Sequence, residues 1–412
     1  MSMEKPAKSE SLWDRLALRR SIVGMLCMAI LVGMGERMSE RFLPVYLLAL
    51  GSGMLWPGYL NALDNFIGAL YSFPGGWLAD RVGVKRSLLI FNLMSIGGYV
   101  FVIAIPRWQT VVIGSVFFMS WSSISLPATM GLVSTALPKA KHVMGVAMHS
   151  LVRRFPQALG PIIGGIFIDR WGPVNGVRLA FGAGIVMALV ALIAQQFLIE
   201  DDRGKGVSAA TEANPFVVMS WFSPELRNLL VSDILIRFCE QIPYAYVVIW
   251  CIESLAGVNT ARVSATTFGL LTGIEMLTAV VCYIPVARMA DRSGKKPFVF
   301  ITFINFALFP LVLYFSHSFG MLVLAFIIRG LKEFGEPTRK ALIMQLAPEG
   351  RKAASFGAYY LCRDTIVALS AFAGAWLWHL GPGANFLTAF GFGILGALWF
   401  ALFGRDQSLE ST

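Results

Sequence analysis

Long apolar segments separated by short polar connections constrain the fold of this chain more than any other feature. Of the 412 residues, 56% are hydrophobic and 14% are charged, whereas soluble domains carry about 25% charged residues. The mean hydropathy is +0.67. A helix that crosses a membrane needs about 20 apolar residues. Twelve such segments can be read along the chain, near residues 21–50, 57–79, 87–105, 109–137, 142–168, 176–199, 228–254, 264–287, 297–316, 319–346, 353–380 and 384–404. We therefore predict an all-α integral membrane protein with twelve transmembrane helices.

One long polar segment divides these helices into two sets of six. It covers residues 200–227 and has the composition of a linker. The predicted organisation is an N-terminal tail (1–20), an N-terminal six-helix bundle (21–199), the linker (200–227), a C-terminal six-helix bundle (228–404) and a C-terminal tail (405–412). The first twenty residues lack the apolar core of a signal peptide, so no cleaved signal is expected.

The basic residues predict the orientation in the membrane. With the N-terminus inside, twenty Lys and Arg residues fall in inside segments and four, Arg107, Arg170, Arg178 and Arg262, fall in outside segments. Positively charged connections remain on the cytoplasmic side. We therefore expect a multi-pass inner-membrane protein with the tails and linker in the cytoplasm. The net charge of +10 then reflects orientation in a lipid bilayer, and no nucleic acid partner is expected.

The cysteines and histidines give no sign of a metal site or cofactor. The five cysteines occur singly, without Cys-x-x-Cys spacing, and the four histidines are scattered. We interpret the cysteines as reduced packing residues. No G-x-x-x-x-G-K-[ST] phosphate loop is present, which argues against an ATP-driven pump.

A charged turn between two apolar segments occurs twice. The first copy runs from Phe73 to Arg86, and a weaker copy runs from Ala290 to Lys296. Gly76 allows close approach of two helices, and Gly83 can adopt a left-handed conformation. Asp80 can accept hydrogen bonds from backbone amides at a neighbouring helix N-terminus.

The duplicated turn resembles the signature between the second and third helices of the major facilitator superfamily, of the bacterial twelve-helix, exporter-like type. The resemblance implies a transporter with two pseudo-symmetric six-helix bundles. It also implies a role in conformational gating for the residues of the two turns: Gly76, Asp80, Arg81, Gly83, Lys85, Arg86, Asp291, Arg292 and Gly294.

The two halves align at a nearly constant offset. Pro127 and Pro337 are 210 residues apart, as are Arg153 and Arg363, while Asp80 and Asp291 are 211 apart, as are Asp64 and Glu275. Internal repeats of this kind place a substrate site near the middle of the membrane, at the pseudo-symmetry axis. We therefore expect one central cavity.

Many ionisable residues lie inside the apolar segments. Such a residue costs several kcal/mol unless it faces a partner or water, so it is a functional candidate. Spacings of three and four allow the pairs Arg37–Glu40, Asp233–Arg237 and Arg329–Glu333 along their own helices. We expect these charges to line a substrate or proton pathway; the alternative is a set of static ion pairs that fix helix packing. The set is Glu36, Arg37, Glu40, Arg41, Asp64, Arg153, Arg154, Asp233, Arg237, Glu240, Glu275, Arg329, Glu333, Glu336, Arg363 and Asp364.

Two shorter patterns bear on the substrate and the direction of transport. Glu36-x-x-x-Glu40-Arg41 is similar to the Glu-x-x-Glu-Arg motif of proton-coupled peptide transporters, with one additional residue in the spacing. Residues 156–165 resemble the G-x-x-x-G-P-x-x-G-G signature of facilitator antiporters, with Pro156 in place of the first glycine. In that signature Gly160, Pro161, Gly164 and Gly165 form a helix-packing motif that implies a seal on the outer side. The helix-4 arginine of drug-exporting relatives is absent from Ser120–Ser125.

Aromatic residues near the expected cavity are candidates for contacting the substrate, although such residues more often pack or anchor helices. They are Tyr46, Trp121, Tyr244 and Tyr359.

These patterns lead to a preferred function and three alternatives. We favour a monomeric secondary transporter that exports a small polar or charged organic solute in exchange for protons. Import by proton symport of a peptide-like or metabolite substrate is the second possibility. A non-transporting receptor is disfavoured because the sequence has no appended soluble domain. A membrane enzyme is disfavoured because no nucleophile–base or metal constellation is recognisable in the sequence.

Overall fold

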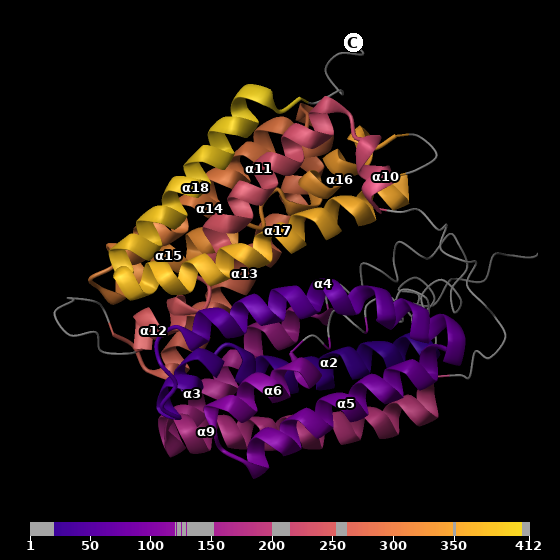
Figure 1. The fold of residues 1–412 in the computed structure, drawn as a ribbon, viewed down its shortest axis with the longest axis vertical. Helices are drawn as coiled ribbons and strands as arrows, with labels where there is room; N and C mark the ends of the chain where they lie inside the picture. Colours follow the sequence, from indigo (N-terminus) through magenta and orange to yellow (C-terminus); the bar gives the residue numbers. More distant parts are fainter. Residues whose placement is uncertain are drawn as a thin grey trace, which may run out of the picture.

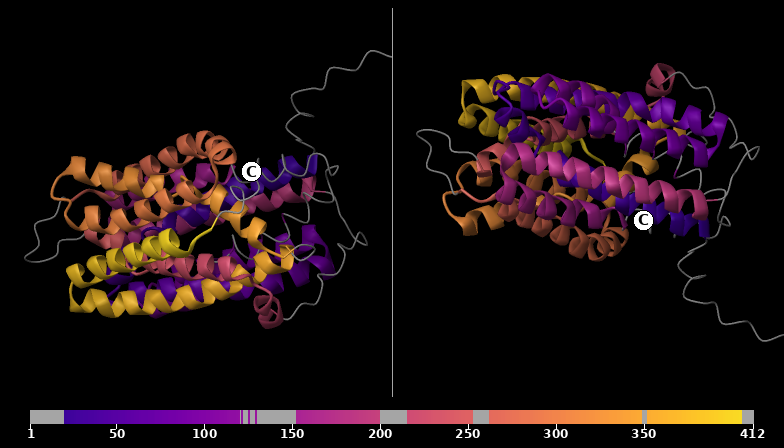
Figure 2. Two further views of the ribbon diagram at one scale, coloured as in Figure 1. Left: turned by 90° about the horizontal axis from the view of Figure 1, so that it is seen from above. Right: turned by 90° about the horizontal axis from the view of Figure 1, so that it is seen from below.

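The computed structural model describes residues 20–119, 121, 125, 129, 152–199, 215–252, 262–348 and 352–405. Within these ranges the chain forms α-helices and no strand (Figure 1). The long helices run roughly side by side in both views of Figure 2. The all-α fold is therefore as predicted. The number of twelve spans stays a prediction, because much of the fourth expected segment and the start of the fifth lie outside the described residues.

Six helices make up the described part of the N-terminal half. They are α2 (Arg20–Glu40), α3 (Leu43–Ala49), α4 (Trp56–Val82), α5 (Val84–Ala104), α6 (Trp108–Phe118) and α9 (Arg154–Leu198). The last of these contains two consecutive helices joined at Gly172, whose φ of 77° is non-helical. It therefore accounts for part of the fifth expected segment and for the sixth.

Nine helices make up the described part of the C-terminal half. They are α10 (Pro215–Ser220), α11 (Pro224–Gln241), α12 (Tyr246–Ile252), α13 (Ala265–Ser293), α14 (Lys296–Tyr314), α15 (Phe319–Leu331), α16 (Glu336–Leu346), α17 (Lys352–Leu380) and α18 (Pro382–Phe403). The short α10 falls within the stretch interpreted as the linker.

The polarity of the helices is that of a membrane protein. Seven helical stretches within the described ranges are long and apolar enough to cross a bilayer. Large apolar side chains such as Leu380, Leu402 and Phe197 are more than 70% exposed at the periphery. By contrast, charged side chains such as Asp233 and Glu275 are fully or almost fully buried. Exposed apolar surface around buried charge is stable when the surrounding solvent is lipid.

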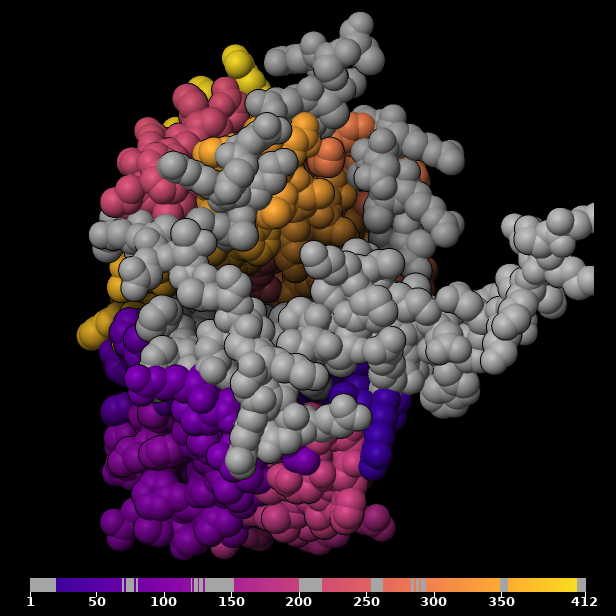
Figure 3. Space-filling model, turned by 90° about the vertical axis from the view of Figure 1, so that its right-hand side faces the viewer, coloured from indigo at the N-terminus to yellow at the C-terminus, as the bar shows by residue number. Residues whose placement is uncertain are grey.

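The helices gather into two bundles (Figure 1). We call α2–α9 the N-terminal bundle and α11–α18 the C-terminal bundle. Both meet at the end that carries Gly172, on the left in Figure 1, where the Tyr246 hydroxyl donates to the Met54 carbonyl over 3.0 Å. Figure 3 looks onto the opposite end, which carries Gly83. We refer to these as the Gly172 end and the Gly83 end.

Closely packed glycines join the bundles. On α9, a Cβ added at Gly164 would collide with the Met38 carbonyl of α2, and one at Gly165 would collide with the Ala265 carbonyl of α13. Gly160 packs in the same way, with its Cβ position 2.6 Å from the Cβ of Arg37, and the Pro161 carbonyl meets Gly269. The antiporter-like motif therefore packs against its own bundle on one face and against the other bundle on the other.

Three helices are broken near the middle of the molecule. The breaks lie at Arg41–Phe42, at residues 242–245 and at 332–335. Each is accompanied by a proline, respectively Pro44, Pro243 and Pro337, which lacks the amide hydrogen that a continuing helix needs. Broken membrane helices often border binding sites because their free backbone groups require polar surroundings.

Candidate functional site: a charged cavity between the bundles

A cavity of about 380 Å³ lies between the two bundles. Ten of its thirteen lining residues are charged or carry an amide side chain. The N-terminal bundle contributes Glu36, Arg37, Glu40, Asp64, Asn65, Gly68, Met119 and Arg153, and the C-terminal bundle contributes Arg237, Gln241, Arg363, Asp364 and Val367. Small-molecule sites occupy about 300–1,000 Å³. The cavity therefore has room for a small polar molecule.

On the N-terminal side, charges are paired both locally and across the cavity. Arg37 and Glu40 form the expected pair, with 2.8 Å between nitrogen and carboxylate oxygen. Arg154 crosses to the other bundle and binds Glu333 at 3.0 Å. Arg41 lies over the ring of Tyr244, 5.1 Å from its centre. The Arg154–Glu333 pair is thus a polar connection between the two bundles.

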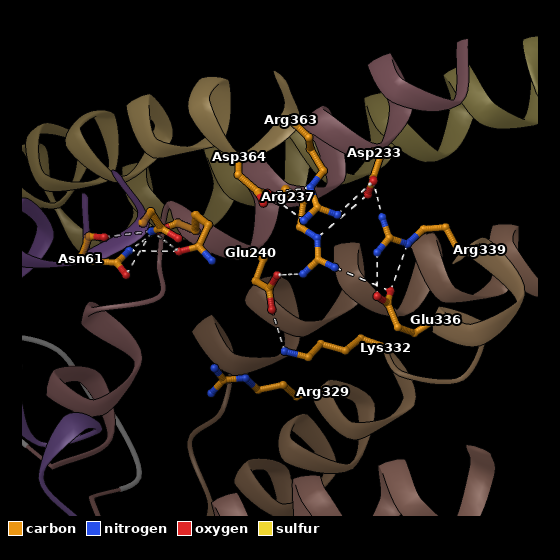
Figure 4. Close-up of polar contacts among 12 residues, drawn as sticks. Asn61, Asp233, Arg237, Glu240, Arg329, Lys332, Glu336, Arg339, Arg363 and Asp364 are labelled. Carbon is orange, nitrogen blue, oxygen red and sulfur yellow. Dashed lines mark hydrogen bonds and ion pairs between the residues drawn. The ribbon is translucent and has the colours of Figure 1, made fainter. Parts of the chain in front are cut away.

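On the C-terminal side, the charges form a continuous network (Figure 4). Glu240 accepts from Arg237 at 2.6 Å and from Lys332 at 2.7 Å. Lys332 also lies 3.6 Å from Glu275, which pairs with Arg329 at 3.4 Å. Arg329 therefore binds Glu275 rather than the expected Glu333, because the break at 332–335 turns Glu333 toward Arg154.

Asp233 is the centre of the remaining part of the network. It binds Arg339 directly and Arg363 at 3.4 Å. Arg339 also binds Glu336 at 2.7 Å, and Arg363 binds Asp364 at 2.7 Å. The network thus matches five basic with five acidic side chains, namely Arg237, Arg329, Lys332, Arg339 and Arg363 with Asp233, Glu240, Glu275, Glu336 and Asp364. This balance explains how so many charges can be buried together.

Several polar residues of this region were not among the site residues predicted from the sequence. Arg339 is 1% exposed and binds two acids. Its spacing of three residues from Glu336 is the sequence feature that indicates an ion pair between them. Asn61 and Asn65 of α4 both donate to the Gln241 side chain at 3.1 Å, which connects the bundles (Figure 4). These amides carry no charge, so a search for buried charges passes over them.

The aromatic candidates lie in different surroundings. Tyr46 is buried against Phe181 in the core, and the buried Tyr359 donates to Asp233 from within the network. Tyr244 lies beside Arg41 in a smaller cavity that adjoins Asp64. Trp121 lines another small cavity together with Glu36, Arg37 and Arg153. Tyr244 and Trp121 are therefore the two that face cavities with charged walls.

Both charged turns contain a glycine with the conformation expected. Gly83 has φ 87° and Gly294 has φ 84°. Lys85 donates to the Gln196 carbonyl at 2.8 Å, while Arg81 and Arg86 are exposed. The side chains of Asp80, Asp291 and Arg292, and the packing of Gly76, lie outside the described part of the structure.

A third turn of the same pattern lies at the opposite end of the molecule. Residues 164–172 read Gly-Gly-x-x-x-Asp-Arg-x-Gly, as do residues 75–83, and Gly172 has nearly the backbone conformation of Gly83. A comparison of the charged turn with every other connection would have revealed it. The Asp169 carboxylate accepts from the backbone amides of Ala265 and Thr266, both at 2.9 Å. It therefore caps α13 of the other bundle.

The hydrogen bonds of this cap affect the acidity of Asp169. Partial burial raises its pKa, but hydrogen bonds from Thr266, Ser264 and Ala265 outweigh burial and lower the pKa from its ordinary value of 3.8. The carboxylate is therefore ionised at neutral pH. A charged group at a helix N-terminus also interacts favourably with the helix dipole.

Within the described ranges, no three His, Cys, Asp or Glu side chains are arranged to hold a metal ion. The charged lining of the central cavity suits it to binding a polar molecule through electrostatic contacts.

Comparisons with known proteins agree with this architecture. The sequence profile described as Major Facilitator Superfamily matches residues 25–261 and 244–412. The multidrug resistance protein MdtG of Klebsiella pneumoniae (strain 342) is 25% identical over 285 residues, which is 66% of each chain. Solute carrier family 2, facilitated glucose transporter member 10, of Danio rerio is 22% identical over 258 residues, covering 56% of this chain and 48% of that protein. The chain thus spans about two thirds of the length of the first of these relatives and about half of the second.

Solved transporter structures share the fold. A mutant of the nucleoside transporter NupG superposes with a TM-score of 0.76 at 10% identity, covering 93% of this chain and all of that one. The peptide transporter POT in complex with sulfate superposes with a TM-score of 0.75 at 13% identity, covering 96% and 97%. With the profile match along almost its whole length, this integral membrane protein belongs to the Major Facilitator Superfamily.

Proposed function

We propose that the protein is a secondary active transporter of the inner membrane that works by alternating access. In this proposal it exports a small polar or charged organic solute in exchange for protons, as a monomer with both termini in the cytoplasm. The observation that carries the proposal is the cavity between the bundles, whose charged walls come from both of them. A cavity divided in this way changes shape when one bundle moves against the other.

Two equivalent acids are suited to couple protons to this motion. Glu40 and Glu240 follow arginines at the same spacing in the two halves, and each is bound to its arginine at the cavity. Protonation of either acid removes the charge that holds the arginine in place. The released arginine is then free to bind the solute or a partner on the other bundle, which links proton binding to conformation.

Export is supported by the glycine seam and by the names of relatives. In this seam Gly165 packs tightly against the other bundle, while Gly160 and Gly164 pack α9 against α2 of its own bundle. This close packing is consistent with the antiporter motif that these residues resemble. Several relatives are named multidrug resistance protein. The largely charged lining favours a polar solute over a lipophilic drug. A lipophilic molecule would displace water from the charged side chains without offering hydrogen bonds in its place.

Import by proton symport is the second candidate. It is favoured by the position of the Glu36-x-x-x-Glu40-Arg41 segment, which resembles the motif of proton-coupled peptide transporters and places its two acids at the cavity. The two directions differ in how proton and solute move: in opposite directions for antiport, and together for symport.

The test uses proteoliposomes loaded with a pH-sensitive dye and exposed to a panel of metabolites. We expect some solutes to drive proton movement in the wild type, with an abrupt loss in Glu40→Gln and Glu240→Gln. Glu225→Gln is the matched control, because Glu225 lies at the end of α11 away from the cavity and contacts only Arg405 at 3.9 Å among the ion pairs of the described residues. Proton movement against the solute supports antiport, and movement with it supports symport. Unchanged proton movement in both cavity variants would exclude these acids from coupling.

A further inference from the structure

Two hydrogen-bond donors without an acceptor among the described residues line the same small cavity beside the central one. Arg153 lines the central cavity and also the small neighbouring cavity that contains Trp121. Of the four arginines that line the central cavity, Arg37, Arg237 and Arg363 are each bound to a carboxylate. Among the described residues, Arg153 makes neither an ion pair nor a hydrogen bond. The Nε1 of Trp121 is buried and likewise has no hydrogen-bond partner there.

An anion satisfies both groups together. The Arg153 side chain is half-buried, so its guanidinium gains from a counter-charge in direct contact, and the buried indole N–H of Trp121 gains from an acceptor. Carboxylate and phosphate groups accept from both kinds of donor, and arginine presents the planar fork that matches them. Glu36 lines both cavities as well, but it already has interaction partners of its own.

We propose that Arg153 and Trp121 form the subsite for an anionic group of the transported solute. This inference rests on the proposed function and specifies its substrate class: small organic molecules that carry a carboxylate or phosphate group. The anion enters from the central cavity, and its remaining atoms occupy the space between the bundles. Among the residues that line this space, Met119 and Val367 are the apolar side chains available to the rest of the solute.

The test measures binding without transport. Inorganic phosphate is titrated into the purified full-length protein at constant ionic strength, and the unfolding temperature is recorded. We expect a saturable rise in the wild type, lost in Arg153→Gln. In Trp121→Phe, which removes only the N–H donor, binding should weaken roughly tenfold. The exposed residues Arg86 and Trp171 supply the controls Arg86→Gln and Trp171→Phe, which should behave as the wild type.

A flat response in the wild type, or a rise that persists in both Arg153→Gln and Trp121→Phe, would overturn the anion subsite. Proton movement with any solute in the proteoliposome assay would still support transport in that case. The two failures are therefore distinguishable.

A second inference comes independently from the turn at Asp169. Its carboxylate belongs to the N-terminal bundle, whereas the two amides it binds begin α13 of the C-terminal bundle. The third amide of α13, that of Thr267, donates to the Ser264 hydroxyl oxygen at 3.2 Å. The first two backbone amides of α13 thus keep these hydrogen-bond acceptors only while the bundles remain together at the Gly172 end.

We infer that Asp169 is a positioning residue that holds the Gly172 end closed and releases it when the bundles separate there. The turn has the same sequence pattern as the charged turn at Gly83, but it lies at the opposite end of the molecule. When the Gly172 end opens, Asp169 and the amides of α13 become solvated instead of binding each other.

Two substitutions weaken this contact from opposite sides. Asp169→Asn removes the charge, and Ala265→Pro removes the amide of Ala265. Proline is well tolerated at the first position of a helix, and Ser264 already has the extended backbone, φ −68° and ψ 163°, that a residue before proline requires. Asp169→Glu preserves the charge and serves as the conservative variant.

The readout is labelling of a cysteine placed at Val367, in the cavity, by a membrane-impermeant thiol reagent from the Gly172 side. The five native cysteines are first replaced by serine. We expect labelling to rise roughly fivefold in Asp169→Asn and in Ala265→Pro, the effect of losing one helix-capping interaction. The increase in the double variant should be smaller than the two single effects combined, because both act on one contact, and Asp169→Glu should restore most of the protection. Wild-type labelling in Asp169→Asn, or additive effects in the double variant, would contradict this role.

Discussion

At the scale of single residues, the buried charges of the C-terminal network are stable because each has a partner within reach. Asp233, Glu336 and Arg339 illustrate this, since Arg339 binds both acids from a position that is 1% exposed. Removing one member of a buried group leaves the others without compensation, which is more destabilising than never having buried them.

We therefore expect Arg339→Gln to lower the free energy of unfolding by about 3–5 kcal/mol, the range for a broken buried ion pair. Its neighbour Lys340 also lies near Glu336, at 3.4 Å, but its side chain is 48% exposed. Lys340→Gln is the control and should change stability by no more than about 1 kcal/mol. Denaturant unfolding in detergent measures both variants. Equal stability of the two would show that the buried network does not hold the bundle together.

Sequence spacing predicted some of these pairs and missed others for a definite reason. Arg37–Glu40 and Asp233–Arg237 lie on continuous helices, and both pairs are present, the second at 4.0 Å. Arg329 and Glu333 are four residues apart, but the helix breaks between them, so helical spacing no longer applies. Pairs between distant segments, such as Arg154–Glu333, depend on how the bundles face each other and have no local signal.

At the scale of helices, the junction between the bundles depends on α9. Its glycines allow backbone contact with α2 and α13, so this helix connects the two bundles. The sequence motif at residues 156–165 predicted close packing but did not identify its partners, because a small residue does not specify what packs against it.

We expect Gly164→Ala to lower stability by roughly 1–3 kcal/mol, the usual effect of overpacking, because its methyl group would collide with the Met38 carbonyl. Gly182→Ala on the same helix is the matched control, since nothing lies within 4 Å of its Cβ position. That control should be neutral or slightly stabilising, because alanine favours a helix more than glycine does. Thermal unfolding of the two variants measures the difference. A neutral effect of Gly164→Ala would mean that α2 and α9 can separate there, within the N-terminal bundle, without loss.

The pH dependence of the α13 cap follows from the lowered pKa of Asp169. A carboxylate with a lowered pKa in the closed state stabilises that state above its ordinary pKa, and loses this effect as the pH falls through the lowered value. The cap should therefore be unaffected between about pH 5 and 8 and weaken only in stronger acid. Cysteine labelling at position 367 from the Gly172 side, measured in Asp169→Asn relative to the wild type, should show a ratio that is constant over this range. A ratio that falls toward one between pH 8 and 5 would contradict the cap as described.

At the scale of the whole molecule, two bundles enclose a charged cavity. In the structure they meet at the Gly172 end, where Tyr246 binds the Met54 carbonyl and Asp169 binds the first amides of α13. The duplicated turns and the constant offset between halves predicted this architecture, because they are properties of the chain itself. The shape and state of the cavity could not be predicted, since they depend on the relative position of two bodies that the sequence describes separately.

The most direct test measures distances between the bundles at both ends. Spin labels are placed on the exposed residues Arg86 and Arg405 at the Gly83 end, and in a second sample on Arg107 and Leu380 at the Gly172 end. Double electron–electron resonance then records both distances in lipid at two pH values, with and without a solute that drives proton movement. We predict reciprocal changes, with one distance lengthening as the other shortens. Two distances that remain fixed, or that lengthen together, would contradict alternating access around this cavity.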